Sequence, residues 1–421
     1  MRICLLSYRG NPYSGGQGVY VFHLARELCR LGHAIDVVVG RPYPRPLSRW
    51  ARVHKVPNLN LWGRYDGDWL PRDRPFSLLS PANLFEFAAT RLRFFPEPFT
   101  FSMRALVCMV GQLRHHGFDL IHDVQSLGYG TWAMKAFGAP VLTTVHHPLT
   151  VDRRHALARS RTLEERYHAA VFYPVAMQGW VIRRVDGVIT ASRAGRAAIA
   201  KDFRVPEGRI GVVPNGVDTE RFRNPGGLRR RQSTLLFVGN TDDARKGAAI
   251  LLQALARLPR RVKLRIVDEG YPARTLIPRE VDRLGLTSRV IFTGRLSAGR
   301  LVEEYSRCTI LVQPSLYEGF GLPAAEALAC GTPVVATDAG AVAEVVSPES
   351  GLLVPPADAQ ALAEGIATLL EDPQRRQSMG LCGPSHIANH FAWPAAARAV
   401  VRVYRRALAG HPIGGEWSAS V

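Results

Sequence analysis

One stretch, residues 309–331, constrains the fold of this chain more than any other. It begins with the apolar run Thr-Ile-Leu-Val-Gln, continues through a loop interrupted by glycines, and ends in a helical segment between Pro323 and Gly331. Proline in the first turn and glycine just past the last turn are common helix boundaries. Such a loop presents backbone N–H groups, and the helix N-terminus adds partial positive charge. The stretch therefore predicts a strand, a loop and a helix that together bind a phosphate-bearing ligand.

Two carboxylates lie in this stretch, Glu318 in the loop and Glu326 in the helix. This spacing allows both side chains to line one cleft. The alternative for so short a motif, taken alone, is an ordinary turn with surface glutamates.

The rest of the chain repeats the alternation of strand and helix, which predicts an α/β protein. Its 421 residues are too many for one hydrophobic core, so two domains of about two hundred residues each are expected. In the first half, strands are expected at 2–7, 34–39 and 185–192, with a helix at 18–32. In the second half, the expected strands are 234–238, 263–267, 290–292, 309–312 and 333–336.

Composition and the N-terminal residues predict a cytoplasmic protein. The chain enters a strand at once, without a charged and then apolar leader. No apolar run approaches the roughly twenty residues that a transmembrane helix needs. The six cysteines are scattered and form no C-x-x-C pair, as is typical of buried thiols in a reducing compartment.

The formal charge of +19 comes mostly from arginine. Nucleic acid, an anionic membrane and anionic small molecules all fit this balance. No nucleic-acid-binding module is recognisable and the arginines are spread along the chain, so no nucleic-acid partner is expected. A peripheral position on the inner face of the membrane is the favoured interpretation, and a basic surface without a partner is the alternative.

Two aromatic segments, 82–95 and 101–115, are expected to be helical on either side of Phe95-Pro-Glu-Pro-Phe99. Arginines are interspersed with their aromatic residues, as in helices that lie at a membrane interface. Packing of the aromatic residues into the core is the alternative.

The segment from Glu318 to Thr337 carries a family resemblance. Glu-Gly-Phe-Gly-Leu-Pro-Ala-Ala-Glu-Ala-Leu-Ala-Cys-Gly-Thr-Pro-Val-Val-Ala-Thr resembles the donor-site signature of retaining, nucleotide-sugar-dependent glycosyltransferases of the GT-B fold, family 4. Residues 13–16, 213–218 and 237–247 resemble other landmarks of that family, in the same order. The resemblance implies two facing Rossmann-like domains with a C-terminal crossover helix. Residues 1–222 would form the acceptor-binding domain, 223–232 the linker, 233–390 the donor domain, and 391–421 the crossover helix and tail.

The resemblance also implies a cationic group at the donor diphosphate. Lys246 matches the cationic residue of the family. The family commonly has an arginine where this chain has Asn240, so we expect Arg245 to supply the second charge. An exposed basic turn is the alternative.

The remaining roles follow from the same resemblance. Glu318 would bind hydroxyls of the donor sugar, and Glu326 would bind the nucleotide ribose, since a carboxylate accepts both protons of a diol. The N–H groups of residues 319–322 would cradle phosphate and sugar, and the segment 290–296 would contact the base. The residues expected to bind the donor are Gly15, Gly16, Phe292, Gly294, Leu296, Gly319, Phe320, Gly321, Leu322 and Glu326.

Two histidines, at positions 122 and 146, lie in the runs 119–123 and 141–147, which are predicted to end two further strands. Strand ends face the ligand crevice in open α/β sheets. His146 matches the histidine of the family, and either side chain can bond a sugar hydroxyl or the acceptor. A structural histidine is the alternative for both. Asp66-Gly-Asp68 has the D-x-D spelling of metal-dependent glycosyltransferases of another fold, but no strand-like run leads into it. We interpret it as a turn in an irregular segment, 41–74.

The predicted reaction is transfer of a hexose, with retention of configuration, from a UDP-, GDP- or ADP-sugar to a hydroxyl acceptor. No cofactor and no metal ion are expected, because Lys246 and Arg245 replace the metal. Membrane lipids and envelope or polysaccharide glycans are the expected acceptors. The alternatives are another GT-B enzyme, of the epimerase or phosphorylase type, and a catalytically idle subunit that binds nucleotide sugars.

Overall fold

The computed structural model describes residues 1–10, 16–44, 46–61, 75–268, 270 and 276–416. Within it the chain divides into two compact units. The first contains Met1–Ala191, Gly195–Val213 and the residues from Ala397 to 416, and the second contains Ser192–Ala194 and Pro214–Ala396. The division after Val213 comes earlier than the predicted boundary at residue 222, and the predicted linker, 223–232, lies in the second unit.

The first unit is built on an eight-stranded sheet in the order β14-β7-β6-β5-β4-β1-β2-β3. Every pair of neighbours is parallel. Its strands are β1 (Arg2–Ser7), β2 (Ala34–Val39), β3 (Arg52–Lys55), β4 (Leu120–Val124), β5 (Val141–Thr144), β6 (Gly187–Thr190), β7 (Ile210–Val212) and β14 (Gly415–Glu416).

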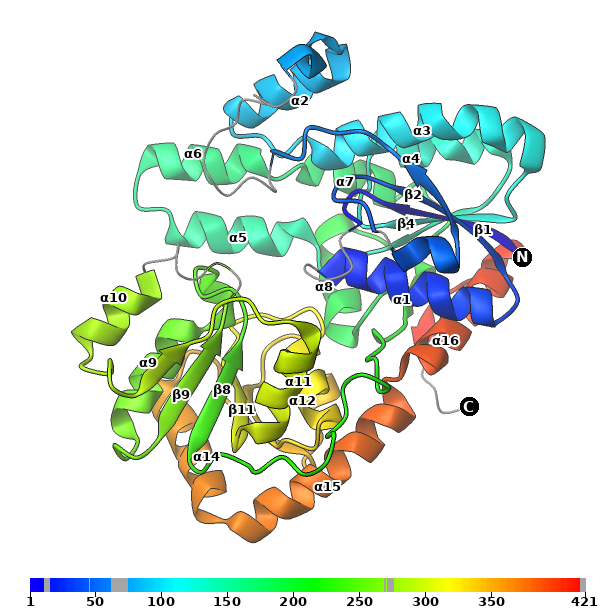
Figure 1. Ribbon diagram of the computed structural model, residues 1–421. Coiled ribbons are helices and arrows are strands. Elements are labelled where there is room, and N and C mark those ends of the chain that lie inside the picture. The colour runs from blue at the N-terminus through cyan, green and yellow to red at the C-terminus, as the bar shows by residue number, and fades with distance from the viewer. Residues whose placement is uncertain (11–15, 45, 62–74, 269, 271–275, 417–421) are drawn as a thin grey trace. The chain divides into compact units, whose positions relative to one another are not determined.

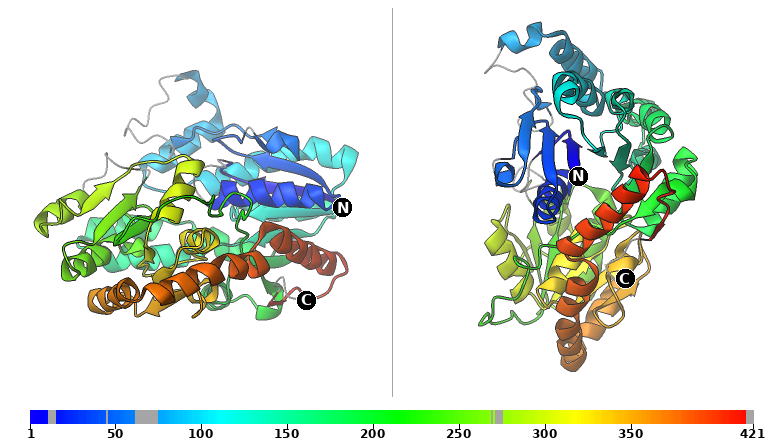
Figure 2. Two further views of the ribbon diagram at one scale, coloured as in Figure 1. Left: turned by 60° about the horizontal axis from the view of Figure 1, so that its bottom comes forward. Right: turned by 90° about the vertical axis from the view of Figure 1, so that its right-hand side faces the viewer.

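Helices connect these strands, as parallel pairing requires. They are α1 (Gly16–Arg30), α2 (Pro81–Arg91), α3 (Glu97–His116), α4 (Tyr129–Ala133), α5 (Leu149–Arg159), α6 (Leu163–Phe172), α7 (Val175–Ile182) and α8 (Arg193–Phe203), with short 3-10 turns η1 (Pro46–Arg49), η3 (Pro75–Leu79), η4 (Met134–Phe137) and η5 (Glu207–Arg209). The last two helices of the chain, α15 (Pro373–His390) and α16 (Trp393–Leu408), follow one another in orange and red in Figure 2. From Ala397 onward, α16 belongs to the first unit.

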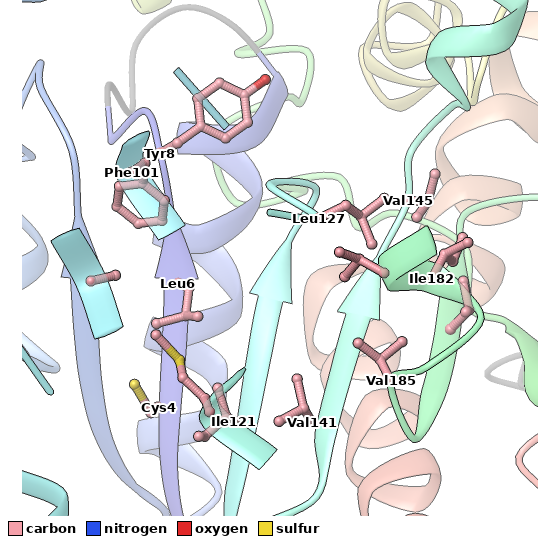
Figure 3. Close-up of a cluster of buried hydrophobic side chains, with 14 of the residues drawn as sticks. Cys4, Leu6, Tyr8, Phe101, Ile121, Leu127, Val141, Val145, Ile182 and Val185 are labelled. Atoms are coloured by element: carbon pink, nitrogen blue, oxygen red, sulfur yellow. The ribbon is translucent and has the colours of Figure 1, made fainter. Parts of the chain in front are cut away.

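The core of the first unit lies against its central strands. Leu6 on β1, Ile121 on β4 and Val141 on β5 are fully buried side by side, as Figure 3 shows. Phe101 of α3 is also buried in this cluster. Because helices cover both faces of a parallel sheet, its central strands are apolar throughout rather than alternating, which is why the sequence marks them clearly.

The second unit contains a parallel six-stranded sheet in the order β10-β9-β8-β11-β12-β13. Its strands are β8 (Thr234–Val238), β9 (Lys263–Val267), β10 (Val290–Phe292), β11 (Ile310–Gln313), β12 (Val334–Thr337) and β13 (Gly351–Val354). Its helices are α9 (Ala248–Arg257), α10 (Leu276–Arg283), α11 (Ala298–Arg307), α12 (Leu322–Ala329), α13 (Val342–Val345), α14 (Ala359–Glu371) and α15, with the 3-10 turn η6 (Ala244–Lys246) (Figure 1). Five of the strands coincide with the prediction to within one residue at each end.

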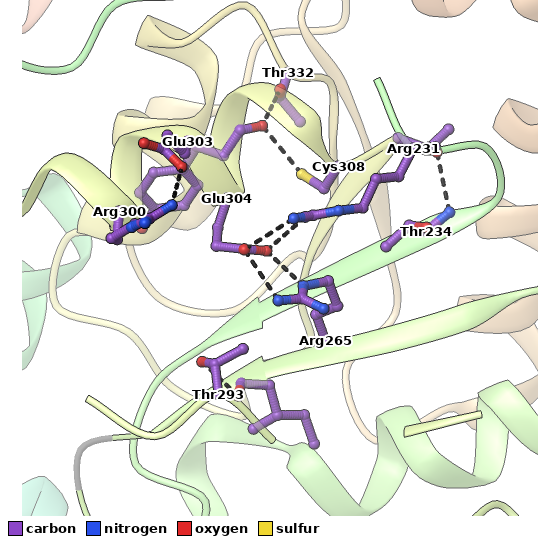
Figure 4. Close-up of polar contacts among 12 residues, drawn as sticks. Arg231, Thr234, Arg265, Thr293, Arg300, Glu303, Glu304, Cys308 and Thr332 are labelled. Carbon is purple, nitrogen blue, oxygen red and sulfur yellow. Dashed lines mark hydrogen bonds and ion pairs between the residues drawn. The ribbon is translucent and has the colours of Figure 1, made fainter. Parts of the chain in front are cut away.

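An ion-pair cluster fixes α11 to the sheet of the second unit. The carboxylate of Glu304 accepts from Arg265 on β9 at 2.6 and 3.0 Å, and from Arg231, just before β8, at 2.7 and 3.1 Å (Figure 4). Burial alone raises the pKa of Glu304, but the hydrogen bonds from the two guanidinium groups outweigh it and lower the pKa. The cluster therefore stays ionised at neutral pH and joins three segments that are distant in sequence.

Three parts of the fold differ from the prediction. Arg52–Lys55 form the edge strand β3 inside the segment 41–74, which we expected to be irregular. The strands β13 and β14, the latter in the predicted tail, were not predicted. The helix α3 begins at Glu97, inside the expected interruption, because Pro98 occupies its first turn, where a missing N–H costs nothing.

No helix in the described part of the chain is long and apolar enough to span a bilayer.

Candidate active site

The second unit places Lys246 and Glu318 in direct contact. Lys246 ends η6, and its Nζ lies 2.8 Å from Oε2 of Glu318. The same oxygen accepts from Gln313 Nε2 at 3.2 Å and lies 3.4 Å from Ser315 Oγ. One carboxylate oxygen thus faces a cation and two neutral donors, all at the carboxyl ends of β8 and β11. The prediction named Lys246 and Glu318 but missed the two neutral donors.

A backbone contact holds the two loops together at this pair. Gly247 has a φ of 71°, and a Cβ atom at this position would lie 1.8 Å from the carbonyl oxygen of Pro314. The N–H of Leu316 donates to the carbonyl of Arg245 at 2.6 Å. Only glycine permits both the left-handed backbone and so close an approach. Gly247 therefore sets the distance from Lys246 to the loop of Glu318.

A second glycine supports Glu318 from the other side. Gly340 has a φ of 65°, and a Cβ there would lie 2.3 Å from the carbonyl oxygen of Glu318. The next N–H, that of Ala341, donates to this carbonyl at 2.9 Å. The backbone of Glu318 is thus held by residues on both sides, and its carboxylate is directed by them.

The loop after Glu318 offers backbone rather than side chains. Phe320 is buried, and its ring centroid lies 5.7 Å from that of Phe391. Gly321 caps α12 with a φ of 99°, and Leu322 is the first residue of the helix. Gln313 Oε1 accepts from the N–H of Ala324 at 3.0 Å, so this side chain connects the helix N-terminus to Glu318. Among the predicted donor-binding residues of this loop, Phe320 can contribute only its main chain.

Glu326 points from α12 to a buried tyrosine. Tyr305 Oη donates to Glu326 Oε2 at 2.8 Å. Burial raises the pKa of Glu326 to about 7, although the Tyr305 hydrogen bond and the charge of Arg221 oppose the rise. Glu326 is therefore a carboxyl group that titrates near neutral pH. Tyr305 was not among the predicted residues.

Arg245 is paired with its own loop. Its guanidinium makes a two-pronged ion pair with Asp243, Nε to Oδ1 at 2.9 Å and the terminal nitrogen to Oδ2 at 2.7 Å. Burial lowers the pKa of Arg245, and the charge of Glu318 acts in the opposite direction. Asn240 accepts from the N–H of Asp242 at 2.9 Å and thus shapes the turn. The role of Arg245 as a second cation for the donor stays a prediction.

A buried carboxylate anchors this turn. Asp268, directly after β9, accepts from the N–H of Thr241 at 2.9 Å and from its hydroxyl at 2.5 Å. The predicted base-contacting residues follow the neighbouring strand: Phe292 ends β10, and Gly294 has a φ of 65° in the loop that leads to Leu296. The carboxyl ends of β8, β9, β10 and β11 therefore lie at one edge of the sheet, with the polar groups that follow β8, β9 and β11.

In the first unit, His146 follows β5 and is the predicted residue. Both of its ring nitrogens are buried and have no hydrogen-bond partner among the described residues. Its ring centroid lies 4.7 Å from that of Tyr20, edge to face. Burial lowers the pKa of His146 to about 3, so the imidazole is neutral near pH 7. Buried ring nitrogens without hydrogen bonds are costly, and a ligand hydroxyl would satisfy them.

The backbone around His146 is held by a residue that sequence analysis missed. Gln125 has a φ of 61°, unusual for a residue with a side chain. Its Oε1 accepts from the N–H of His146 at 3.0 Å, and its Nε2 donates to the carbonyl of His147 at 3.2 Å. His147 in turn lies 3.0 Å from Asp152 Oδ2. Strain at such a position often accompanies a functional site.

His122 lies within β4, not at a strand end as predicted, and is a structural residue. Its Nδ1 lies 2.5 Å from Tyr404 Oη on α16, and its Nε2 lies 2.7 Å from Thr144 Oγ1. Both nitrogens are engaged and the side chain is fully buried. Of the two interpretations left open, the structural one is correct for His122.

The remaining predicted residues lie at the edge of, or outside, the described ranges. Gly16 is the first residue of α1, and a Cβ there would meet nothing within 4 Å. Gly15, Asp66 and Asp68 lie outside the described residues. Within those residues, no three His, Cys, Asp or Glu side chains are grouped so that they could hold a metal ion.

Comparison with known proteins assigns the family. Residues 14–221 match the family model described as Glycosyltransferase Family 4, and residues 218–384 match that of Glycosyl transferases group 1. The chain is 39% identical to the MMP alpha-(1->4)-mannosyltransferase of Mycolicibacterium hassiacum, over 97% of this chain and 99% of that protein. The protein belongs to the group 1 glycosyltransferases. It is therefore an enzyme that transfers a sugar, and its strand-end residues form the candidate site for this reaction.

Solved structures agree with this assignment. The glycosyltransferase resembles sucrose-phosphate synthase from Thermosynechococcus elongatus with a TM-score of 0.74 and 26% identity, covering 97% of this chain and 99% of that one. It also resembles Anabaena HepE, solved with UDP-glucose, with a TM-score of 0.69 and 20% identity over 96% and 99% of the two chains. The latter likeness shows the fold alone. The enzyme has the GT-B fold, as the sequence predicted.

Proposed function

We propose that this glycosyltransferase moves a hexose from a nucleotide-diphosphate sugar to a hydroxyl acceptor, with retention of configuration and without a metal ion. The observation that carries the proposal is the 2.8 Å contact between Lys246 and Glu318 at the carboxyl edge of the second sheet. A cation and a hydrogen-bonding carboxylate lie there beside the N-terminus of α12, where an anionic leaving group would be stabilised.

Lys246 supplies the charge that the reaction requires. As the glycosyl bond breaks, negative charge accumulates on the leaving diphosphate, and a fixed cation stabilises it more than it stabilises the ground state. Glu318 orients the ammonium group before the donor arrives. When the diphosphate binds, Lys246 turns toward it, and the carboxylate is released to accept sugar hydroxyls.

Glu326 binds the nucleotide ribose in this proposal. Tyr305 occupies one lone pair of its Oε2, and the remaining acceptor sites serve the diol. His146 contributes from the first unit as a neutral imidazole that bonds a substrate hydroxyl through a ring nitrogen. The relative named as a mannosyltransferase, and the fold neighbour solved with UDP-glucose, support a hexose and a nucleotide donor.

The proposed acceptor is a glycan or membrane-lipid hydroxyl, and the proposed location is the surface of an anionic membrane. The net charge of +19 supports this location, as do exposed apolar side chains on η3 and α2. Phe76 is 82% exposed, Leu79 is 80% exposed and Phe85 is 49% exposed. The variant Phe76→Ser/Leu79→Ser should cosediment less with vesicles of anionic lipid than the parent enzyme. Equal cosedimentation would contradict this location.

The experiment that tests the activity begins with the donor. Unfolding temperatures measured with a panel of UDP-, GDP- and ADP-sugars should rise by a few degrees with the true donor. Sugar transfer is then assayed with that donor, for the parent enzyme, for Glu318→Ala and for the control Glu349→Ala, whose residue is exposed. We expect transfer to fall about a hundredfold in Glu318→Ala only.

Two outcomes would contradict the proposal. Donor binding with neither transfer nor donor hydrolysis, across a panel of acceptors, would favour an idle nucleotide-sugar-binding protein. Complete loss of transfer in the presence of a chelator, with recovery on adding Mg²⁺, would contradict the role given to Lys246.

A further inference from the structure

The second unit contains a cavity at the opposite edge of its sheet from Lys246 and Glu318. The cavity has a volume of about 670 Å³ and lies where β8 begins and just before β11, against the first turns of α15. Such a volume is sufficient for a small metabolite. In Figure 1, the green segment that leads into β8 passes close to the orange helix α15. None of its lining residues is used by the proposed reaction.

The lining of this cavity is basic and contains no carboxylate. Arg230 and Arg376 reach it from different segments, and neither forms an ion pair within the described part of the chain. A third arginine, Arg231, is already paired with Glu304. The negative charge of Asp372 acts to raise the pKa of Arg376, against the effect of burial. The Asp372 carboxylate, however, is the N-cap of α15 and accepts from the N–H of Arg375 at 2.8 Å. Within the described residues, neither guanidinium group is therefore bonded to a carboxylate, although Asp372 lies near Arg376.

Each of the two guanidinium groups binds the carbonyls at the end of a helix. Arg230 donates to the carbonyl of Gly331 at 2.5 Å, just beyond α12, and to that of Cys308 at 3.3 Å. Arg376 donates through one terminal nitrogen to the carbonyls of Leu369 and Leu370, at the end of α14. Three helix ends, those of α11, α12 and α14, face the two groups, and each carries roughly half a negative charge, so about half of one positive charge is left uncompensated.

The two charges also repel each other. Burial lowers the pKa of Arg376, the charge of Asp372 opposes this, and the positive charge of Arg230 lowers the pKa further. An anion placed between the two groups would relieve this repulsion and bind donors of Arg376 that the helix carbonyls do not use, since a guanidinium has five N–H groups.

The rest of the lining is uncharged and combines polar residues with the apolar side chains of Leu370, Pro373, Leu381 and Pro384. Asn224, Gln232, Ser233 and Gln377 surround the arginines. Amides and hydroxyls of this kind bind the hydroxyl groups of a sugar or polyol. We propose that this cavity, between Arg230 and Arg376, is a second anion site of the enzyme, which binds the phosphate group of a small phosphorylated sugar or polyol, separate from the donor site.

The experiment separates this site from the donor site by working in the variant Lys246→Ala. Binding of inorganic phosphate and of glucose 6-phosphate is measured by calorimetry at low ionic strength. Gln377→Glu adds one negative charge to the cavity without removing any of the arginine contacts. Gln374→Glu adds the same charge to the same turn of α15, at a residue that does not line the cavity.

We expect glucose 6-phosphate to bind to Lys246→Ala and more tightly than inorganic phosphate. Gln377→Glu should weaken its binding at least about tenfold, because a like charge then lies within a few ångströms of the phosphate, whereas Gln374→Glu should change it less than about threefold. Equal effects of the two substitutions would overturn the proposal. So would the absence of binding in Lys246→Ala, or equal affinity for the two probes, which would leave no role for the sugar.

Discussion

The carboxyl edges of the two sheets carry polar groups of opposite character. In the second unit, Lys246 and Glu318 are charged and already paired at 2.8 Å. In the first unit, His146 is held neutral by burial, and its ring nitrogens have no partner among the described residues. The difference suggests that one edge stabilises charge that develops during the reaction, while the other bonds uncharged hydroxyl groups. Each prediction below tests one side of this comparison.

The largest effect is expected for Lys246→Ala. Removing the only lysine at the described part of the charged edge should lower kcat for sugar transfer about 10²–10³-fold, as loss of a transition-state cation or donor typically does. The exposed Lys201 provides a matched control, and Lys201→Ala should retain the parent rate. Similar rates for all three proteins would show that the charged edge does not act on the leaving group.

Gly247→Ala tests how the charged edge is built. Its Cβ would lie 1.8 Å from Pro314 O, so the two loops must separate, at a cost of about 2–4 kcal/mol in the free energy of unfolding. Gly285→Ala is the control, because Gly285 has a φ of 65° and nothing within 4 Å of a Cβ. Gly285→Ala should lower the free energy of unfolding only by the strain of a left-handed backbone, about 1 kcal/mol. Equal losses in urea unfolding would show that the contact with Pro314 O is unimportant.

His122→Gln tests the neutral edge through pH. Burial lowers the pKa of His122 to about 3, so the unfolded chain takes up this proton first as the pH falls below about 6.5. The contribution of neutral His122 to the free energy of unfolding is therefore fully present above pH 6.5. It declines toward pH 3 by about 1.4 kcal/mol per pH unit. Urea unfolding at several pH values should show a shallower decline in His122→Gln than in the parent. An unchanged slope would mean that His122 is not neutral in the folded enzyme.

His146→Ala is expected to have the smallest effect. Loss of one uncharged hydrogen bond to the substrate should lower kcat/KM about tenfold. Because the ring nitrogens of His146 have no hydrogen bond to lose among the described residues, and only the ring contact with Tyr20 is removed, the unfolding temperature should change little. His147→Ala is the neighbouring control, since His147 bonds Asp152 instead. A large loss of stability without loss of activity would make His146 structural, like His122.

The sequence predicted the parts of the fold that local chemistry determines. The strands of both sheets are apolar because both faces are covered, and the loop of Glu318 is marked by its glycines and by Pro323. The edge strand β3 was missed because its residues, Arg-Val-His-Lys, are half exposed and carry no apolar run. Only pairing with β2 makes this segment a strand.

The candidate site shows a similar division. Lys246, Glu318 and His146 were predicted as site residues from their motifs, and their roles stay predictions, whereas the side chains that orient them were not predicted. Gln313 and Tyr305 are ordinary residues of a strand and a helix, and only folding brings them to Glu318 and Glu326. His122 and His146 look alike in sequence, although His122 lies within β4 and His146 follows β5. What separates them is that Tyr404, 282 positions away, bonds one of them and not the other.

The contact of Gly247 with Pro314 has a consequence for engineering. Since the main chains of the two loops touch, the segments 239–247 and 309–321 must move as one body whenever either shifts. A chimaera that imports the second segment from another enzyme, to change the sugar it accepts, would then need the first segment from the same source. Exchange of one segment without the other should leave a clash or a gap between Gly247 and Pro314, next to Lys246.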